Sequence, residues 1–226
     1  MDCAKWEERG LAMSGAKGKA GGLRAQFTTK SLVLIPIAVG INLVGGTLCS
    51  MLKLPLFLDT VGTLVVATLS GPWVAALTGL ITNVFLAIVA NPVNLPYAVV
   101  SVLVGLTAGY LAKAGLFNKV WGAVVVWLVI TLVNSVSASL ITTFVFGGAT
   151  GINGTSVLTA ALIVAMQDVL VSVLSSSFIE NLVDKGVSVL IAYMIWKKIP
   201  RRFISQYASD ASEDDEEDDD VDGVRP

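Results

Sequence analysis

The chain has 226 residues, of which 54% are hydrophobic and only 14% are charged, and its mean hydropathy is +0.77. A soluble domain carries about 25% charged residues, so this composition indicates a membrane protein. The chain contains no histidine and only two cysteines. These counts exclude Ser-His-Asp catalysis, imidazole metal sites and a disulfide scaffold. We therefore expect no enzyme, no cofactor and no metal centre.

The net charge of −2 conceals a strong segregation along the chain. Residues 1–30 hold six basic and three acidic groups, whereas residues 31–196 hold only four of each. The stretch 203–226 holds ten acidic groups and one basic group. The sequence thus predicts a basic cytoplasmic N-terminal segment at 1–30, a membrane domain at 31–202 and an acidic, disordered cytoplasmic tail at 203–226.

Turn signals divide the membrane domain into apolar segments, each of which can be compared with the roughly 20 residues that a helix needs to cross a bilayer. Residues 147–155 are too rich in glycine for a helix, and residues 156–196 are too many for one crossing. We expect a break near Ser175–Ser177, preceded by an amphipathic or partly re-entrant segment. The prediction is an all-α, polytopic membrane protein with six transmembrane helices, at 31–52, 57–70, 72–90, 97–112, 120–146 and 178–196.

Six spans place both termini on one side of the membrane. If that side is the cytoplasm, twelve basic residues of the chain lie inside and only Lys53 lies outside. The positive-inside rule therefore predicts a multi-pass membrane protein with both termini cytoplasmic. A signal peptide is the competing interpretation of the first span, but no small-x-small cleavage site follows it.

Ionisable side chains within the spans are functional candidates, because a charge in lipid is costly unless it finds a partner. Glu180 and Asp184 lie one turn apart in the sixth span, and Lys185 follows. The cluster is either a structural ion pair of Asp184 with Lys185 or a ligand contact, for which Glu180 is the better candidate. Asp59 opens the second span, where it either caps the helix or contacts a ligand.

Uncharged polar residues extend this candidate site. Asn83 and Asn134 either hold helices together or contact a ligand, and the pair Gln167-Asp168 is open to a structural or a ligand role. Asn91 and Asn94 flank Pro92 and are interpreted as turn residues. The predicted substrate-binding residues are Asp59, Thr60, Asn83, Asn134, Gln167, Asp168, Glu180 and Asn181.

Small residues recur every four positions on one face of the first span, at Ala38, Asn42, Gly46 and Ser50. Such a stripe lets another helix approach closely, either in a partner subunit or within the chain. We interpret Ala38, Asn42 and Gly46 as a partner-docking face. The sequence has no P-loop motif for ATP hydrolysis and no basic surface interleaved with aromatic residues for nucleic acid.

Two stretches, LPLFLDTVGT at 54–63 and GPWVAALTGLITN at 71–83, resemble the substrate-binding S components of energy-coupling factor (ECF) transporters. The later sequences FGG at 146–148, Asp184-Lys185 and IPRR at 199–202 extend the resemblance. It implies a six-helix subunit in membrane lipid that captures a vitamin or related micronutrient on the outer side. The second-span pattern is similar to the branch that takes cobalamin or a precursor.

The resemblance also implies partners, namely a transmembrane T component and two ATPase subunits that drive uptake. In that family the first helix commonly presents an Ala-x-x-x-Ala type face to the T component, and the stripe of Ala38, Asn42 and Gly46 departs from this pattern. The alternative function is a ligand-sensing or signalling membrane domain that binds but does not transport. The two functions differ in their need for an energy source. A transporter moves its ligand only with its ATPase partners, whereas a sensor binds its ligand and moves nothing.

The topology can be tested by cysteine labelling. We expect Val93→Cys and Ile152→Cys to react with an impermeant thiol reagent added outside intact cells, and Leu116→Cys to react only after the membrane is permeabilised. The reverse labelling pattern would show that the termini lie outside.

Overall fold

The computed structural model describes residues 26–151 and 155–200, and this part of the chain is all-helical, as predicted. The predictions for the basic N-terminal segment up to residue 25 and for the acidic tail lie outside the described residues. Two 3-10 turns, η2 (Pro92–Asn94) and η3 (Leu116–Asn118), join neighbouring α-helices. The α-helices are α2 (Thr29–Met51), α3 (Val61–Leu69), α4 (Pro72–Val89), α5 (Ala98–Lys113), α6 (Val120–Phe146), α7 (Thr155–Met166) and α8 (Val169–Lys198).

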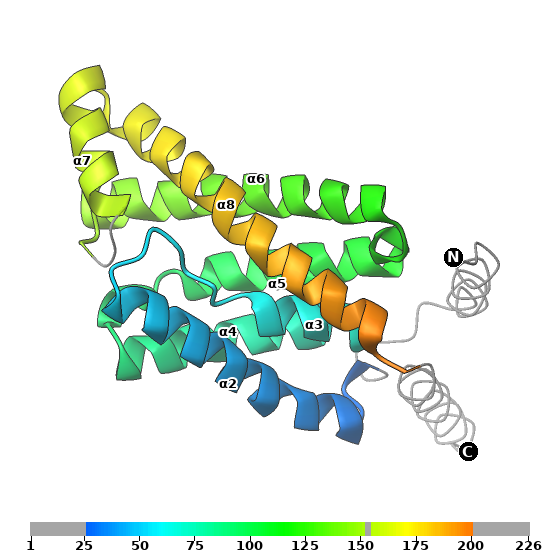
Figure 1. The fold of residues 1–226 in the computed structure, drawn as a ribbon. Helices are drawn as coiled ribbons and strands as arrows, with labels where there is room; N and C mark the ends of the chain where they lie inside the picture. Colours follow the sequence, from blue (N-terminus) through cyan, green and yellow to red (C-terminus); the bar gives the residue numbers. More distant parts are fainter. Residues whose placement is uncertain (1–25, 152–154, 201–226) are drawn as a thin grey trace, which may run out of the picture.

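The helices form a bundle with two distinct ends (Figure 1). Helix α2 begins and α8 ends at one end, which we call the terminal end. The segment 53–60, the turn around η2 and helix α7 lie at the opposite end, which we call the distal end. Within the described residues, α2, α4 and α6 are long and apolar enough to cross a membrane.

Most boundaries follow from local signals. Gly71 has a φ of +90° and Pro72 occupies the first turn of α4, while α6 ends at Gly147 in the left-handed conformation. The predicted break at Ser175–Ser177 is wrong, because those serines lie inside α8. The chain instead turns at Gln167 and Asp168, where the Asp168 side chain caps α8 by accepting a hydrogen bond from the Val171 N–H at 3.1 Å.

The second predicted span is only partly helical. Helix α3 has nine residues and begins at Val61, so residues 57–60 are not part of it. The predicted capping role of Asp59 is also wrong, because Thr60 occupies the N-cap position and makes no side-chain capping bond. A helix of nine residues is only about 14 Å long. The segment 53–60 leads into α3 as irregular chain, with positive φ at Lys53 and Leu58, and runs from the distal end toward the middle of the bundle (Figure 1).

The small-residue face of α2 packs inside the protein. The backbone of α3 lies so close that a Cβ on Gly62 would clash with the Ala38 carbonyl. The buried Asn42 donates to Thr63 Oγ1 at 2.9 Å and to Thr82 Oγ1 at 3.1 Å, and it accepts from the Gly62 N–H at 2.7 Å. The predicted partner-docking role is therefore wrong for Ala38 and Asn42, which are buried against α3 and α4, whereas Gly46 is half-buried beside Asp59 and Leu86.

Two matched substitutions on α2 test this packing. A Cβ on Gly46 would lie 3.3 Å from Asp59 Cβ and from Leu86, whereas nothing lies within 4 Å of a Cβ on Gly40. We expect Gly46→Leu to destabilise the purified protein by about 1–3 kcal/mol through overpacking, and Gly40→Leu to leave the melting temperature in detergent unchanged. Equal melting temperatures for the two variants would contradict the internal packing.

Candidate functional site

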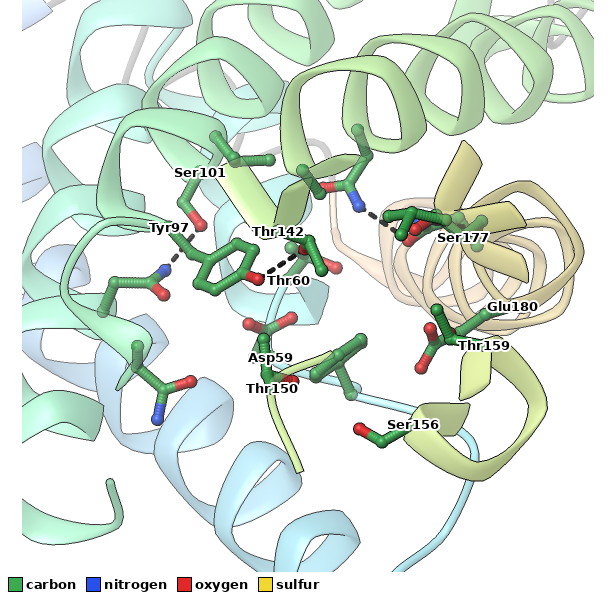
Figure 2. Close-up of a pocket in the computed structure, with 18 of the residues that line it drawn as sticks. Asp59, Thr60, Tyr97, Ser101, Thr142, Thr150, Ser156, Thr159, Ser177 and Glu180 are labelled. Carbon is green, nitrogen blue, oxygen red and sulfur yellow. Dashed lines mark hydrogen bonds between the residues drawn. The ribbon is translucent and has the colours of Figure 1, made fainter. Parts of the chain in front are cut away.

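The distal end contains a cavity of roughly 790 Å³, counting the space at its open mouth. Its wall combines residues from the segment 57–60, from α4 to α8 and from the glycine-rich loop after α6 (Figure 2). Polar side chains dominate this wall, although the surrounding helices are apolar. A concave site with convergent polar groups is the usual form of a small-molecule binding site.

A buried ion network forms the floor of the cavity. Lys185 Nζ lies 2.7 Å from Asp184 Oδ2 and 3.7 Å from Asp59 Oδ1, and it donates to Thr60 Oγ1 at 3.3 Å. The side chains of Lys185 and Asp184 are 2% and 0% exposed, whereas that of Asp59 is 16% exposed. One ammonium group therefore contacts two carboxylates, and Asp59 is the carboxylate that reaches the cavity.

Asp184 also fixes the irregular chain that precedes α3. Its Oδ1 accepts hydrogen bonds from the backbone N–H groups of Phe57 at 2.9 Å and Leu58 at 2.8 Å. Leu58 has a φ of +49°, an uncommon conformation for a bulky residue. Backbone N–H groups at membrane depth need partners within the protein, and the Asp184 carboxylate provides one for both.

Amide side chains join the helices around the cavity. Asn134 Nδ2 donates to Asn181 Oδ1 at 2.6 Å and so links α6 to α8, while Asn83 Nδ2 donates to Ser101 Oγ at 2.5 Å and links α4 to α5. These four residues also line the cavity. The two predicted roles of Asn83 and Asn134, helix contact and a place in the site, are therefore compatible in this geometry.

An aromatic side chain is held rigidly in the wall. The Tyr97 hydroxyl lies 2.6 Å from Thr142 Oγ1, and its ring stacks on Phe146 with ring centroids 5.9 Å apart. The turn before it is fixed by Asn91, whose side chain accepts from the Val93 N–H, as expected for a turn residue. Asn94 donates to the Asn91 carbonyl in the same turn, and it also lines the cavity.

The structure brings most of the predicted site residues together at this cavity, but it does not include Gln167 and Asp168. Both lie exposed at the corner between α7 and α8, where Asp168 caps the helix. Among the described residues, no three His, Cys, Asp or Glu side chains converge to hold a metal ion. The predicted residues that line the cavity are Asp59, Thr60, Asn83, Asn134, Glu180 and Asn181.

Sequence analysis missed Tyr97 and the hydroxyl side chains of the wall, such as Thr142, Thr159 and Ser177. Serine and threonine occur throughout the apolar helices and commonly bond to their own backbone, so their positions alone carry no signal for a site. Tyr97 does follow the Asn-Pro-rich turn, which could have marked it as a side chain at a helix entrance.

Comparisons with known proteins agree with the earlier resemblance. Residues 30–196 match the family described as "ECF transporter, substrate-specific component", so the match includes every helix that lines the cavity. No curated protein and no solved structure matches the chain significantly.

Two substitutions of Asp184 separate its charge from its hydrogen bonds. We expect Asp184→Ala to lower stability by about 3–5 kcal/mol, because it strands the backbone N–H groups of Phe57 and Leu58 and removes the main partner of Lys185. Asp184→Asn should be milder, since its amide oxygen can still accept both bonds. Thermal unfolding in detergent measures the difference, and identical losses in the two variants would argue against the backbone role.

Proposed function

The chain belongs to the substrate-specific components of ECF transporters, and from this membership we propose that its distal cavity is the substrate-binding site. The family assigns the chain a substrate-binding role in a transporter. The observation that carries the proposal is the concentration of polar groups from seven parts of the chain around one opening at the distal end of the bundle. Several of these side chains already bond to a neighbouring helix, and each keeps further lone pairs or N–H and O–H groups with which it can bind a ligand.

We propose that the substrate is a vitamin or related micronutrient. The cavity opens at the distal end and its wall mixes polar and apolar groups, which is the usual form of a site for a small organic molecule. Cobalamin or a precursor, suggested by the second-span pattern, is the specific candidate.

The proposed orientation places the cavity on the outer side of the bacterial cell membrane. Among the lysines in the described residues, Lys53 lies at the distal end, whereas Lys30, Lys113, Lys119, Lys197 and Lys198 lie in the parts of the chain that form the terminal end. The positive-inside rule then puts the terminal end, with both termini, in the cytoplasm. A transmembrane T component and two ATPase subunits would complete the transporter, using surfaces other than the buried face of α2.

Filling the cavity should separate binding from folding. Ala138 on α6 lines the cavity, and Val136 on the same helix is 49% exposed on the outside of the bundle. We expect Ala138→Phe to weaken substrate binding at least tenfold with little change in melting temperature, and Val136→Phe to bind normally, because only the first side chain occupies ligand space.

The measurement begins with the compound released from the purified wild-type protein and identified by mass spectrometry. Binding is then titrated for both variants, and uptake is measured in cells with and without the T component and the ATPases. Normal binding by Ala138→Phe would place the site elsewhere. Binding without uptake, even when the partners are present, would favour the sensing alternative.

A further inference from the structure

Two buried amide side chains turn their oxygen atoms toward the cavity. Asn83 and Asn134 are only 2% and 9% exposed, and both line the cavity. Within the described part of the chain, no donor reaches the Oδ1 atom of either side chain. Neither oxygen is among the fully enclosed polar atoms that lack a partner there, so each reaches open space, and the space that both residues line is the cavity.

The orientation of Asn83 is fixed by a backbone carbonyl. Its Nδ2 donates to the Gly79 carbonyl at 3.3 Å and to Ser101 Oγ at 2.5 Å. A carbonyl oxygen can only accept, so the nitrogen and not the oxygen of the amide must face Gly79. Both N–H groups of Asn83 are then occupied, and the atom that remains for a ligand is the acceptor Oδ1.

The orientation of Asn134 is fixed in two steps by another carbonyl. Asn181 Nδ2 donates to the Ser177 carbonyl at 2.8 Å, so Asn181 Oδ1 is the atom that accepts from Asn134 Nδ2 at 2.6 Å. The Oδ1 of Asn134 is therefore the second fixed acceptor. Figure 2 shows Ser101 and Ser177, the neighbours of the two amide groups, on opposite sides of the opening, so the two acceptors belong to different walls.

On the premise that the cavity binds the substrate, we propose that the substrate donates hydrogen bonds to Asn83 Oδ1 and Asn134 Oδ1 from two of its edges. The class of compound that fits carries carboxamide, amino, ring N–H or hydroxyl groups at those edges. Ester, ether or N-alkyl groups in the same places would strip water from the two oxygens without replacing its hydrogen bonds. A site with buried polar groups discriminates strongly against an analogue that leaves them unpaired.

The other polar groups of the wall do not make this distinction. The hydroxyl groups of serine and threonine can donate or accept, so they adapt to either kind of ligand. Lys185 is the only Lys or Arg among the described lining residues, and its ammonium group already contacts Asp184, Asp59 and Thr60. The preference for a donating substrate therefore depends on the two amide oxygens.

Matched pairs of compounds test the preference on the unaltered protein. The pairs are cobinamide with heptamethyl cobyrinate, riboflavin with 3-methylriboflavin, and nicotinamide with methyl nicotinate. In each pair the second compound has methyl groups or methyl esters where the first has N–H donors. The compound carried from the producing cells is identified by mass spectrometry and, if it is none of these, joins the panel together with its N- or O-methylated form.

We expect the protein to bind one donor compound and to bind its methylated partner about tenfold or more weakly. Equal binding of the two, with exclusion of both by Ala138→Phe, would overturn the inference while leaving the proposed function intact. Binding of no compound from either source, or equal binding by Ala138→Phe, would overturn the proposed function and the inference with it.

Replacing each amide by leucine, which has a similar size, assigns the preference to its acceptor. We expect Asn83→Leu and Asn134→Leu to weaken binding of the donor compound by about tenfold or more and to leave binding of its methylated partner nearly unchanged. A purely structural loss would instead weaken both compounds equally.

The control variants are Thr82→Val and Ser135→Ala. Each removes a buried hydroxyl that joins two helices, next to one of the amides in the sequence but outside the cavity. Both controls should keep the full preference within the pair. A preference that survives in both leucine variants, with folding verified by the melting temperature, would overturn the inference.

Discussion

The contact between Lys185 and Asp184 is the interaction on which the distal half of the protein depends. Both side chains are buried inside the helical bundle, and neither charge is tolerable there without the other. Asp184 also accepts hydrogen bonds from the backbone of Phe57 and Leu58, so the same carboxylate holds α8 and the irregular chain before α3 in one arrangement. The network consequently positions Asp59, which contacts Lys185 and reaches the cavity.

The cavity exists because one crossing is not a complete helix. Irregular backbone at membrane depth is tolerated only where its polar groups find partners in the protein or where it lines a cavity. The segment before α3 does both, because Asp184 accepts from the N–H groups of Phe57 and Leu58, and residues 57, 59 and 60 line the cavity. Small residues make room for this irregular path, since Gly62 on α3 and Gly45 on α2 allow close backbone approach where a Cβ would clash with the carbonyls of Ala38 and Leu58. The close packing of α2 against α3 therefore also determines the path of this segment, and with it the shape of the site.

The sequence predicted the helical class and most boundaries, because proline, glycine and asparagine determine turns locally. It failed where local signals are ambiguous. Ser176 bonds to the Val173 carbonyl and remains inside α8, whereas the less obvious Asp168 caps the helix and sets the break. Similarly, the spacing of Ala38, Asn42 and Gly46 indicates close packing but does not say whether the neighbouring helix belongs to the same chain.

Part of the candidate site could be predicted, because a charged or amide side chain within an apolar span needs a reason to be there. This argument identified Asp59, Glu180 and the asparagines, but it does not apply to the hydroxyl groups of serine and threonine. Which charges meet in the site was not predictable, because residues 31–196 contain equal numbers of basic and acidic groups, four of each. Only the fold separates them: Lys113 and Lys119 lie toward the terminal end, away from the acidic residues. The fold likewise brings Asp59 next to Lys185, which lies far along the chain, and this contact at the floor of the cavity cannot be read from the spacing of the two residues.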